Sequence, residues 1–214
     1  FKDKDYKSAI LEFNKAINQD PNNFDYYSIR AIAKLNSKDL KGAISDYTKA
    51  LKINPKSFTS YLNRGIAKSQ LNDNQGAIDD YNRSIEINPT NAIAYNLLGV
   101  AKIKIDDYES AVFNFQKVIT LDPKSNDAST AYQNICSLKY KSKNFDDAIN
   151  ACNKALAIDP KSSYALDTRG DVKFSLGDRD GACIDYKNAI TNGYKQREKY
   201  LASKEGEWCK NLPN

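Results

Sequence analysis

Cysteine and aspartate are the residue types here that could support catalysis or metal binding, because the chain has no histidine among its 214 residues. Histidine is the commonest general base and the commonest metal ligand. The cysteines form no C-x-x-C pair of the kind that binds metals or exchanges electrons: Cys136, Cys152, Cys183 and Cys209. We therefore expect no metal site and no cofactor.

The carboxylates do not form a catalytic pattern either. Pairs such as Asp79–Asp80 and Asp106–Asp107 stand at predicted helix starts or on exposed helix faces, where carboxylates cap helices and hydrate the surface. The chain also lacks the G-x-x-x-x-G-K-[ST] loop of nucleotide-binding proteins and the G-x-S-x-G turn of hydrolases. The sequence predicts that this segment is not an enzyme.

Composition and charge narrow the range of partners. Hydrophobic residues make up 41% of the chain and charged residues 28%, which is typical of a soluble folded protein. The net charge is only +5 and the chain has only six arginines, so we expect no nucleic-acid partner. No apolar run is long enough to span a bilayer, so we expect no membrane insertion in this segment.

The absence of methionine bears on the cellular location. We expect the chain to be a processed or excised piece, with any signal peptide outside it. A cytoplasmic location is slightly favoured, and an exported or periplasmic location stays open.

One pattern recurs along the chain. The stretch Gly76–Pro89, GAIDDYNRSIEINP, has near-copies at Gly42–Pro55 and Ser110–Pro123. The prolines that end such copies are separated by 34, 34, 34 and 37 residues: Pro21, Pro55, Pro89, Pro123 and Pro160. Each copy has an alanine near its start, an aromatic residue four positions later (Cys152 is the exception) and, in most copies, a small residue three positions further on. These spacings place the three residues on one face of a helix.

An earlier helical segment precedes each copy. Tyr61–Leu71 aligns with Tyr95–Ile105 and Leu166–Leu176. Its middle position always holds a small residue: Ala31, Gly65, Gly99, Cys136 and Gly170. A glycine inside a helix costs about 1 kcal/mol relative to alanine. We therefore expect the two helices to approach closely there, with the recurring alanine as the partner.

This arrangement of small, alanine, aromatic, small and proline positions resembles the tetratricopeptide repeat. The resemblance covers nearly the whole chain and implies an all-α fold, a right-handed superhelical α-solenoid of antiparallel helix pairs. Residues 1–214 would then be a single solenoid, with the second helix of a truncated repeat in 1–23 and a capping helix in 197–212. The full repeats are residues 24–57, 58–91, 92–125, 129–162 and 163–196.

Two departures from the pattern predict local differences. Residues 126–128 are an insertion, which predicts a longer helix or a bent loop before the fourth full repeat. The last repeat has TNGYKQ in place of its proline, with Gly193 as the helix stop.

A lysine recurs where the family usually has an aromatic residue: Lys34, Lys68, Lys102, Lys139 and Lys173. These lysines could form a basic ladder for an acidic partner. Alternatively, their aliphatic stems fill the place of the ring and the ammonium groups reach water near Asp46, Asp80 and Asp185. We favour the second interpretation.

Placed on the repeats, the cysteines form two candidate pairs. Cys136 and Cys152 belong to the two helices of one repeat, and Cys183 and Cys209 belong to the last repeat and the capping helix. In an exported protein these could be disulfides, whereas in the cytosol they would be small buried hydrophobic residues. Both interpretations stay open, and Cys183–Cys209 is the better supported pair because terminal repeats fray.

The resemblance also implies a function. First helices in the family line a concave groove that holds a peptide, so we predict a non-enzymatic scaffold or adaptor that binds a peptide or protein segment. Periodicity selects these groove candidates: Ile32, Asn63, Ile66, Gln70, Asn96, Val100, Lys104, Asn134, Tyr140, Lys141 and Asp171. We expect this groove to be basic near Lys104 and Lys141 and acidic at Asp167 and Asp171. Packing between helices is the alternative role of its apolar members.

Two other functions stay open. The chain could self-associate through an exposed terminal helix that carries Phe1, Ile10 and Phe13, or it could be the interaction domain of a larger protein whose other domain carries the activity. The two-carboxylate clamp of heat-shock co-chaperones is not expected. The positions where it needs lysine and arginine hold other residues: Ser28, Thr59, Leu62, Ile93, Leu97, Gln133 and Thr168.

Overall fold

The structure is a computed structural model that describes residues 3–203 and 206–209. This part of the chain forms twelve α-helices, one short 3-10 helix and no strand. The helices are α1 (Asp3–Gln19), α2 (Phe24–Asn36), α3 (Leu40–Ile53), α4 (Phe58–Gln70), α5 (Asn74–Ile87), α6 (Ala92–Ile103), α7 (Tyr108–Leu121), α8 (Asn126–Lys141), α9 (Phe145–Ile158), α10 (Ser163–Ser175), α11 (Arg179–Thr191), α12 (Gln196–Ala202) and η1 (Glu207–Cys209). The predicted fold class, an all-α solenoid of helix pairs, is confirmed.

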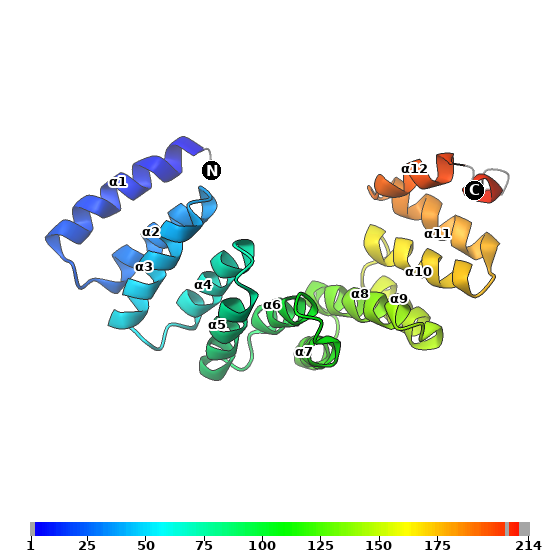
Figure 1. The fold of residues 1–214 in the computed structure, drawn as a ribbon, viewed down its shortest axis with the longest axis horizontal. Helices are drawn as coiled ribbons and strands as arrows, with labels where there is room; N and C mark the ends of the chain where they lie inside the picture. Colours follow the sequence, from blue (N-terminus) through cyan, green and yellow to red (C-terminus); the bar gives the residue numbers. More distant parts are fainter. Residues whose placement is uncertain (1–2, 204–205, 210–214) are drawn as a thin grey trace. The chain divides into compact units, whose positions relative to one another are not determined.

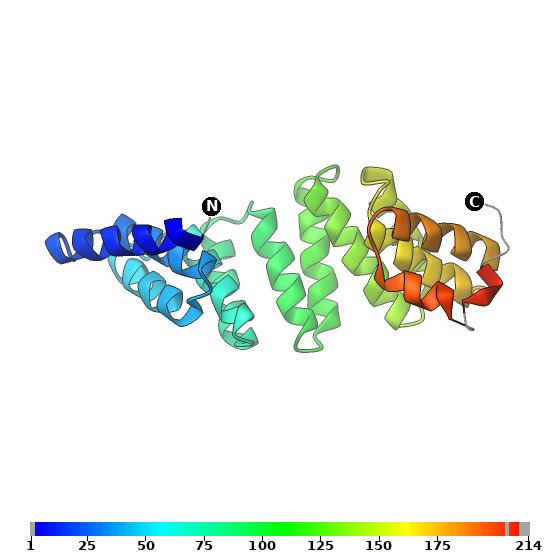
Figure 2. The ribbon, with the colours of Figure 1, turned by 90° about the horizontal axis from the view of Figure 1, so that it is seen from above.

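The helices divide into two compact units, residues 1–111 and 112–214, and the boundary lies within α7. In the first unit α2 packs on α3 and α4 packs on α5, as both views show (Figure 1, Figure 2). In the second unit α8 packs on α9 and α10 packs on α11. The assignment of residues 1–214 to a single solenoid stays a prediction.

The turn inside each repeat has one backbone geometry. One residue in each of these turns has a positive φ: Lys38, Asn72, Asp106, Lys143 and Gly177. The second helix that follows begins with an Asn or Asp cap; Asp73, for example, accepts a hydrogen bond from the backbone N–H of Gly76 at 3.0 Å. The start of each second helix is therefore determined by residues next to it in the sequence.

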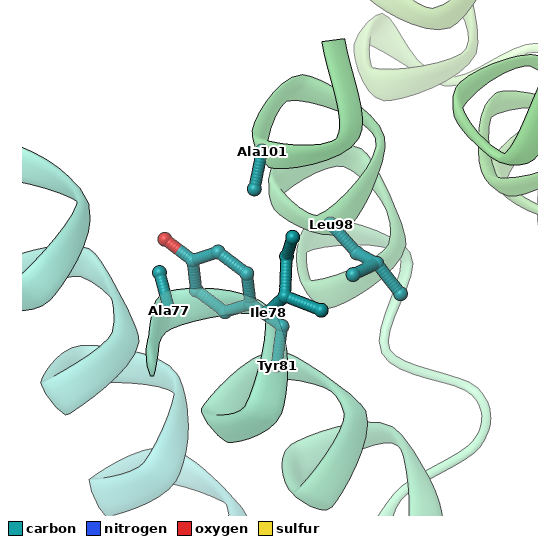
Figure 3. Close-up of a cluster of buried hydrophobic side chains, with 5 residues drawn as sticks. All are labelled: Ala77, Ile78, Tyr81, Leu98 and Ala101. Carbon is teal, nitrogen blue, oxygen red and sulfur yellow. The ribbon is translucent and has the colours of Figure 1, made fainter. Parts of the chain in front are cut away.

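In the first unit, an aromatic ring of the second helix packs under the small residue of the first helix. Tyr81, Ala77 and Ile78 of α5 meet Leu98 and Ala101 of α6 in one buried cluster (Figure 3). The expected alanine does lie next to the mid-helix glycine, but the aromatic ring comes closer. A methyl group added to Gly65 would lie 2.6 Å from the Tyr81 ring but 3.3 Å from the Ala77 carbonyl oxygen, so the ring sets the close approach.

In the second unit, the α10–α11 pair keeps this contact between Gly170 and the Tyr186 ring, whereas in the α8–α9 pair a disulfide takes its place. Cys136 of α8 stands at the glycine position and Cys152 of α9 at the aromatic position, and their sulfurs are bonded, with Cα atoms 5.3 Å apart. The insertion at 126–128 forms the first turn of α8, which makes this a longer helix rather than a bent loop. At the end of α11, Gly193 has a φ of +103°, as a helix stop requires.

The predicted capping helix, 197–212, is shorter in the structure. Among the described residues, α12 ends at Ala202 and the next helical turn is η1. Residues 204–205 and 210–212 of the prediction lie outside the described residues.

Three repeats contain a buried group of charges, which we call the Arg–Asp–Lys cluster. Arg64 of α4 donates to both carboxylate oxygens of Asp80 in α5, at 2.9 and 2.6 Å, and the Lys68 ammonium lies 2.8 Å from the same carboxylate. Arg64 also donates to Thr48 of the preceding helix α3 at 3.1 Å. The equivalent groups are Arg30, Lys34 and Asp46 with Asn14, and Arg169, Lys173 and Asp185 with Asn153.

The other two full repeats lack this cluster. Leu98 and Ile135 stand at the arginine position, and Asn114 and Ala151 stand at the aspartate position. The lysines of these repeats pair instead with acids near the start of the second helix: Lys102 with Asp107 at 2.8 Å, and Lys139 with Asp147 at 3.3 Å. The expected proximity of lysine ammonium groups to Asp46, Asp80 and Asp185 is confirmed, but these lysine side chains are largely buried instead of reaching water. The recurring lysines are therefore engaged within the chain.

We predict that Asp80→Ala lowers the free energy of unfolding by about 3–5 kcal/mol, because it leaves two cations without their buried counter-ion. Its exposed neighbour Asp79, which accepts a hydrogen bond from Gln75 at 3.0 Å, is the matched control. Asp79→Ala should change stability by at most about 0.5 kcal/mol. Urea unfolding followed by circular dichroism measures both, and equal losses in the two variants would contradict a stabilising role for the cluster.

Candidate functional site

The first helices of the first unit lie next to one another, α2 beside α4 and α4 beside α6. We call the predicted groove positions on these three helices the first-helix face. Its members are Ile32 of α2, Asn63, Ile66 and Gln70 of α4, and Asn96, Val100 and Lys104 at or beside α6. Seven of the predicted groove residues thus lie on or beside neighbouring helices of one unit, and their grouping into a groove stays a prediction.

The outer apolar members of this face are open to solvent. Ile32 is 43% exposed and Val100 is 39% exposed, and Ile29 and Ile93 are exposed beside them. An aliphatic side chain gains about 1.5–3 kcal/mol when it becomes fully buried. These side chains can therefore bind the apolar side chains of a ligand.

The central apolar members have a different role. Ile66, Leu62 and Leu97 pack against the cluster of Tyr81 and Leu98. For these residues the alternative interpretation, packing between helices, is correct. The central apolar residues are consequently held by packing against neighbouring helices, while the outer ones stay exposed and can contact a ligand.

Polar groups on this face are already oriented by neighbours. The Lys104 ammonium donates to the hydroxyl and the carbonyl of Ser69, at 3.0 and 3.4 Å, which ties the end of α6 to α4. Burial raises the pKa of Tyr81 to about 12, and Ser69 opposes this rise. Burial also raises the pKa of Tyr47, and the nearby Asn63 side chain opposes this rise. The Tyr47 hydroxyl makes no hydrogen bond of normal geometry.

The predicted groove residues of the second unit are Asn134, Tyr140 and Lys141 of α8 and Asp171 of α10. Tyr140 packs on Phe145 with ring centroids 6.1 Å apart. Tyr140 and Lys141 line a pocket of ≈ 300 Å³ together with Lys143, Phe145 and Ser175. This pocket lies at the turn between α8 and α9 and contains two lysines, while the basic groove near Lys141 stays a prediction.

Asp171 does not present an open acidic surface. It accepts hydrogen bonds from Arg197 of α12 at 2.9 Å and from the Tyr186 hydroxyl at 2.8 Å. Burial raises the pKa of Asp171, and the positive charge of Arg197 opposes that rise. Periodicity on its own did not identify Arg197. The repeat spacing nevertheless points to Arg197, because it lies 34 residues after Ser163 and so stands where the next repeat would begin.

Within the described residues there is neither a metal-binding cluster nor a helix that could span a membrane. Nowhere in 3–203 and 206–209 do three His, Cys, Asp or Glu side chains lie close enough to hold a metal ion. No helix in this part of the chain has the length and apolar character needed to cross a membrane.

Comparisons with known families agree with the helix pairs. A TPR repeat model matches residues 67–106, and a tetratricopeptide repeat model matches residues 24–57, 92–125 and 129–162. Together these matches cover more than half of the chain. A comparison with curated protein sequences gave no significant match.

Solved structures of other proteins are similar to this one. A crystal structure of MamA is 27% identical over 78% of this chain and 96% of MamA, with a TM-score of 0.69. A tetratricopeptide repeat protein from Parabacteroides merdae is 23% identical over 96% of this chain and 83% of that one, with a TM-score of 0.78. YrrB, described as a TPR protein with an unusual peptide-binding site, is 20% identical over 89% of this chain and 96% of YrrB, with a TM-score of 0.69. The last two likenesses show the fold alone.

Both cysteine pairs are bonded in the structure, and all four side chains are buried. We predict that the denatured chain has no reactive thiol before reduction and four after it. Replacing Cys136 and Cys152 together by serine should cost about 3 kcal/mol of stability, because the bond limits the entropy of the unfolded chain. Thiol titration in denaturant checks the first expectation, and four thiols without a reductant would contradict it.

Proposed function

The chain belongs to the tetratricopeptide repeat family, and from that premise we propose that it is a non-enzymatic scaffold that binds a peptide or protein segment on its first-helix face. The observation that carries this proposal is the exposure of Ile32 and Val100 at equivalent repeat positions on α2 and α6, on helices of one unit that also carry the amides Asn63 (α4) and Asn96 (α6). A ligand segment would place apolar side chains on the exposed aliphatic groups, while the amides would pair with its backbone.

The charges of the chain support a protein ligand over a nucleic acid. Arg30, Arg64 and Arg169 are held in buried ion pairs with aspartates, so their guanidinium groups are already used. Base recognition in a nucleic acid needs such groups free at the surface. The first-helix face instead combines apolar and amide side chains, which suit a polypeptide.

The repeats of related proteins support the same class of function. YrrB, which shares the fold, has a peptide-binding site. Residues that could act as general base or metal ligand are scarce here, since histidine is absent and both cysteine pairs are bonded. The chain could also be the interaction domain of a larger protein whose other domain carries an activity.

Self-association is the second candidate, and the exposure of Leu11 on α1, at 59%, favours it. Of the residues first considered for it, Phe13 packs on Tyr26 with ring centroids 6.2 Å apart, so it is less available than the sequence alone implied. Phe1 lies outside the described residues.

To test the scaffold proposal, a peptide array is screened with the full chain, and the affinity of the best peptide is measured for variants. We predict that Ile32→Glu or Val100→Glu weakens binding by about tenfold or more, because each introduces a charge where the ligand buries apolar surface. The melting temperature should hardly change, since both positions are exposed. Leu11→Glu, an equally drastic change on the same unit but away from this face, is the control. Unchanged affinity in both face variants would show that the ligand binds elsewhere.

Self-association makes a separate prediction. Light scattering across a concentration series should show a mass that rises with concentration in the unaltered chain and stays that of a monomer in Leu11→Glu. A constant monomer mass in the unaltered chain counts against this candidate.

A further inference from the structure

Two carboxylates on α10 occupy positions where α4 carries apolar residues. Asp167 and Asp171 align with Leu62 and Ile66 in the register of the repeats. Leu62 and Ile66 pack on an apolar cluster, whereas Asp167 is a charged residue with only 5% of its surface exposed. A buried carboxylate remains charged only if it is paired or well hydrogen-bonded. A positive charge is therefore needed next to the Asp167 carboxylate.

Arg197 of α12 supplies this cation. Its Nε and Nη2 atoms donate to the two carboxylate oxygens of Asp167, at 2.5 and 2.9 Å, and Nη2 also donates to Asp171 at 2.9 Å. The guanidinium carbon lies 4.3 Å from the ring centroid of Tyr186 and 5.2 Å from that of Tyr200. The Tyr186 hydroxyl donates to Asp171 and so fixes the second carboxylate. A bidentate carboxylate, a second carboxylate and an aromatic face are the groups that recognise a guanidinium.

The segment that carries Arg197 depends on its contacts to stay in place. The helix α12 has only seven residues, far fewer than an isolated helix needs to be stable. After α12, Trp208 of η1 packs on Phe174 with ring centroids 5.2 Å apart, and Cys209 is bonded to Cys183 of α11. The disulfide closes a chain segment of 26 residues, and Arg197 lies inside it. The bond therefore limits how far Arg197 can move from the two carboxylates.

We propose that Asp167, Asp171 and Tyr186 form a binding site for an arginine side chain of a partner protein, that Arg197 occupies this site in the oxidised chain, and that reduction of Cys183–Cys209 makes the site available. In the reduction, two thiols of a reductant form a new disulfide, the Cys183–Cys209 bond breaks, and the two thiol protons pass to Cys183 and Cys209. Arg197 is then attached from one side only, so its effective concentration at the carboxylates falls and a partner's arginine can compete. This inference concerns α10 to α12 alone and stands or fails independently of the first-helix face.

The first experiment asks whether the site accepts a guanidinium that is not part of the chain. Arg197→Ala vacates the site, and the melting temperature of this variant is measured with millimolar ethylguanidinium, using ethylammonium at equal concentration as the control. We expect a saturable rise of about 2–4 °C with ethylguanidinium, because a ligand that binds only the folded chain stabilises it. The same variant with Asp167→Asn and Asp171→Asn added should show no rise.

A rise of equal size in the triple variant or with ethylammonium would overturn the site, and so would the absence of a rise in Arg197→Ala. Arg197→Gln keeps part of the aliphatic stem and replaces Arg197→Ala if that variant shows no cooperative melting transition.

The second experiment tests the disulfide. The affinity of a fluorescein-labelled Gly-Ser-Arg-Ser-Gly peptide is measured on the oxidised chain, the reduced chain and Cys209→Ser, which leaves Cys136–Cys152 intact. We expect binding to tighten by about tenfold on reduction and equally in Cys209→Ser. Arg197→Ala should bind the peptide tightly whether oxidised or reduced, and the matched peptide with lysine should bind more weakly. Equal affinity of the oxidised and reduced chains would overturn control by the disulfide.

Discussion

The buried aspartate of the second helix is the constraint on which the helix pairs depend. Asp46, Asp80 and Asp185 each have at most 3% of their surface exposed, and a carboxylate so far from water must be matched by positive charge and hydrogen bonds. In all three repeats the first helix supplies both an arginine and a lysine. Because the arginine binds in a bidentate, planar way, it fixes the rotation of one helix against the other more narrowly than apolar packing would.

The same arginine joins each pair to the helix before it. Arg30 reaches Asn14 of α1, Arg64 reaches Thr48 of α3, and Arg169 reaches Asn153 of α9. One side chain thus connects three consecutive helices. The cations of the first helices are thereby directed inwards, and the surface that these helices leave open is largely neutral. This explains why the first-helix face combines aliphatic and amide groups in a chain with a net charge of +5.

The sequence predicted much of this fold, because repetition makes the helix pairs and their small, aromatic and lysine positions visible. It predicted the lysine–aspartate proximity as well. It did not predict that Tyr81 rather than Ala77 lies closest to Gly65, since periodicity gives a face but not the rotation that decides which side chain on it comes nearest. Periodicity also could not show that Ile32 is exposed while Ile66 is partly buried. They occupy equivalent positions, but Ile66 packs against Tyr81 and Leu98 of the next two helices, and periodicity does not show how closely neighbouring helices cover a given position. The sequence did not predict the pairing of Arg197 with Asp167 and Asp171, because the segment after residue 196 keeps the spacing of the repeats but not their residue pattern.

The Cys136–Cys152 bond has a consequence for how the chain can assemble. It stands at the two positions where other repeats place a glycine under a tyrosine ring, in a repeat that also lacks the Arg–Asp–Lys cluster. In a stack whose stability is the sum of local terms, folding can begin at any repeat and spread to its neighbours. Once oxidised, α8 and α9 form a closed hairpin whose loop entropy is already lost in the unfolded chain. That hairpin is then the place where nucleation costs least, even though its repeat lacks the charged cluster that α10 and α11 share.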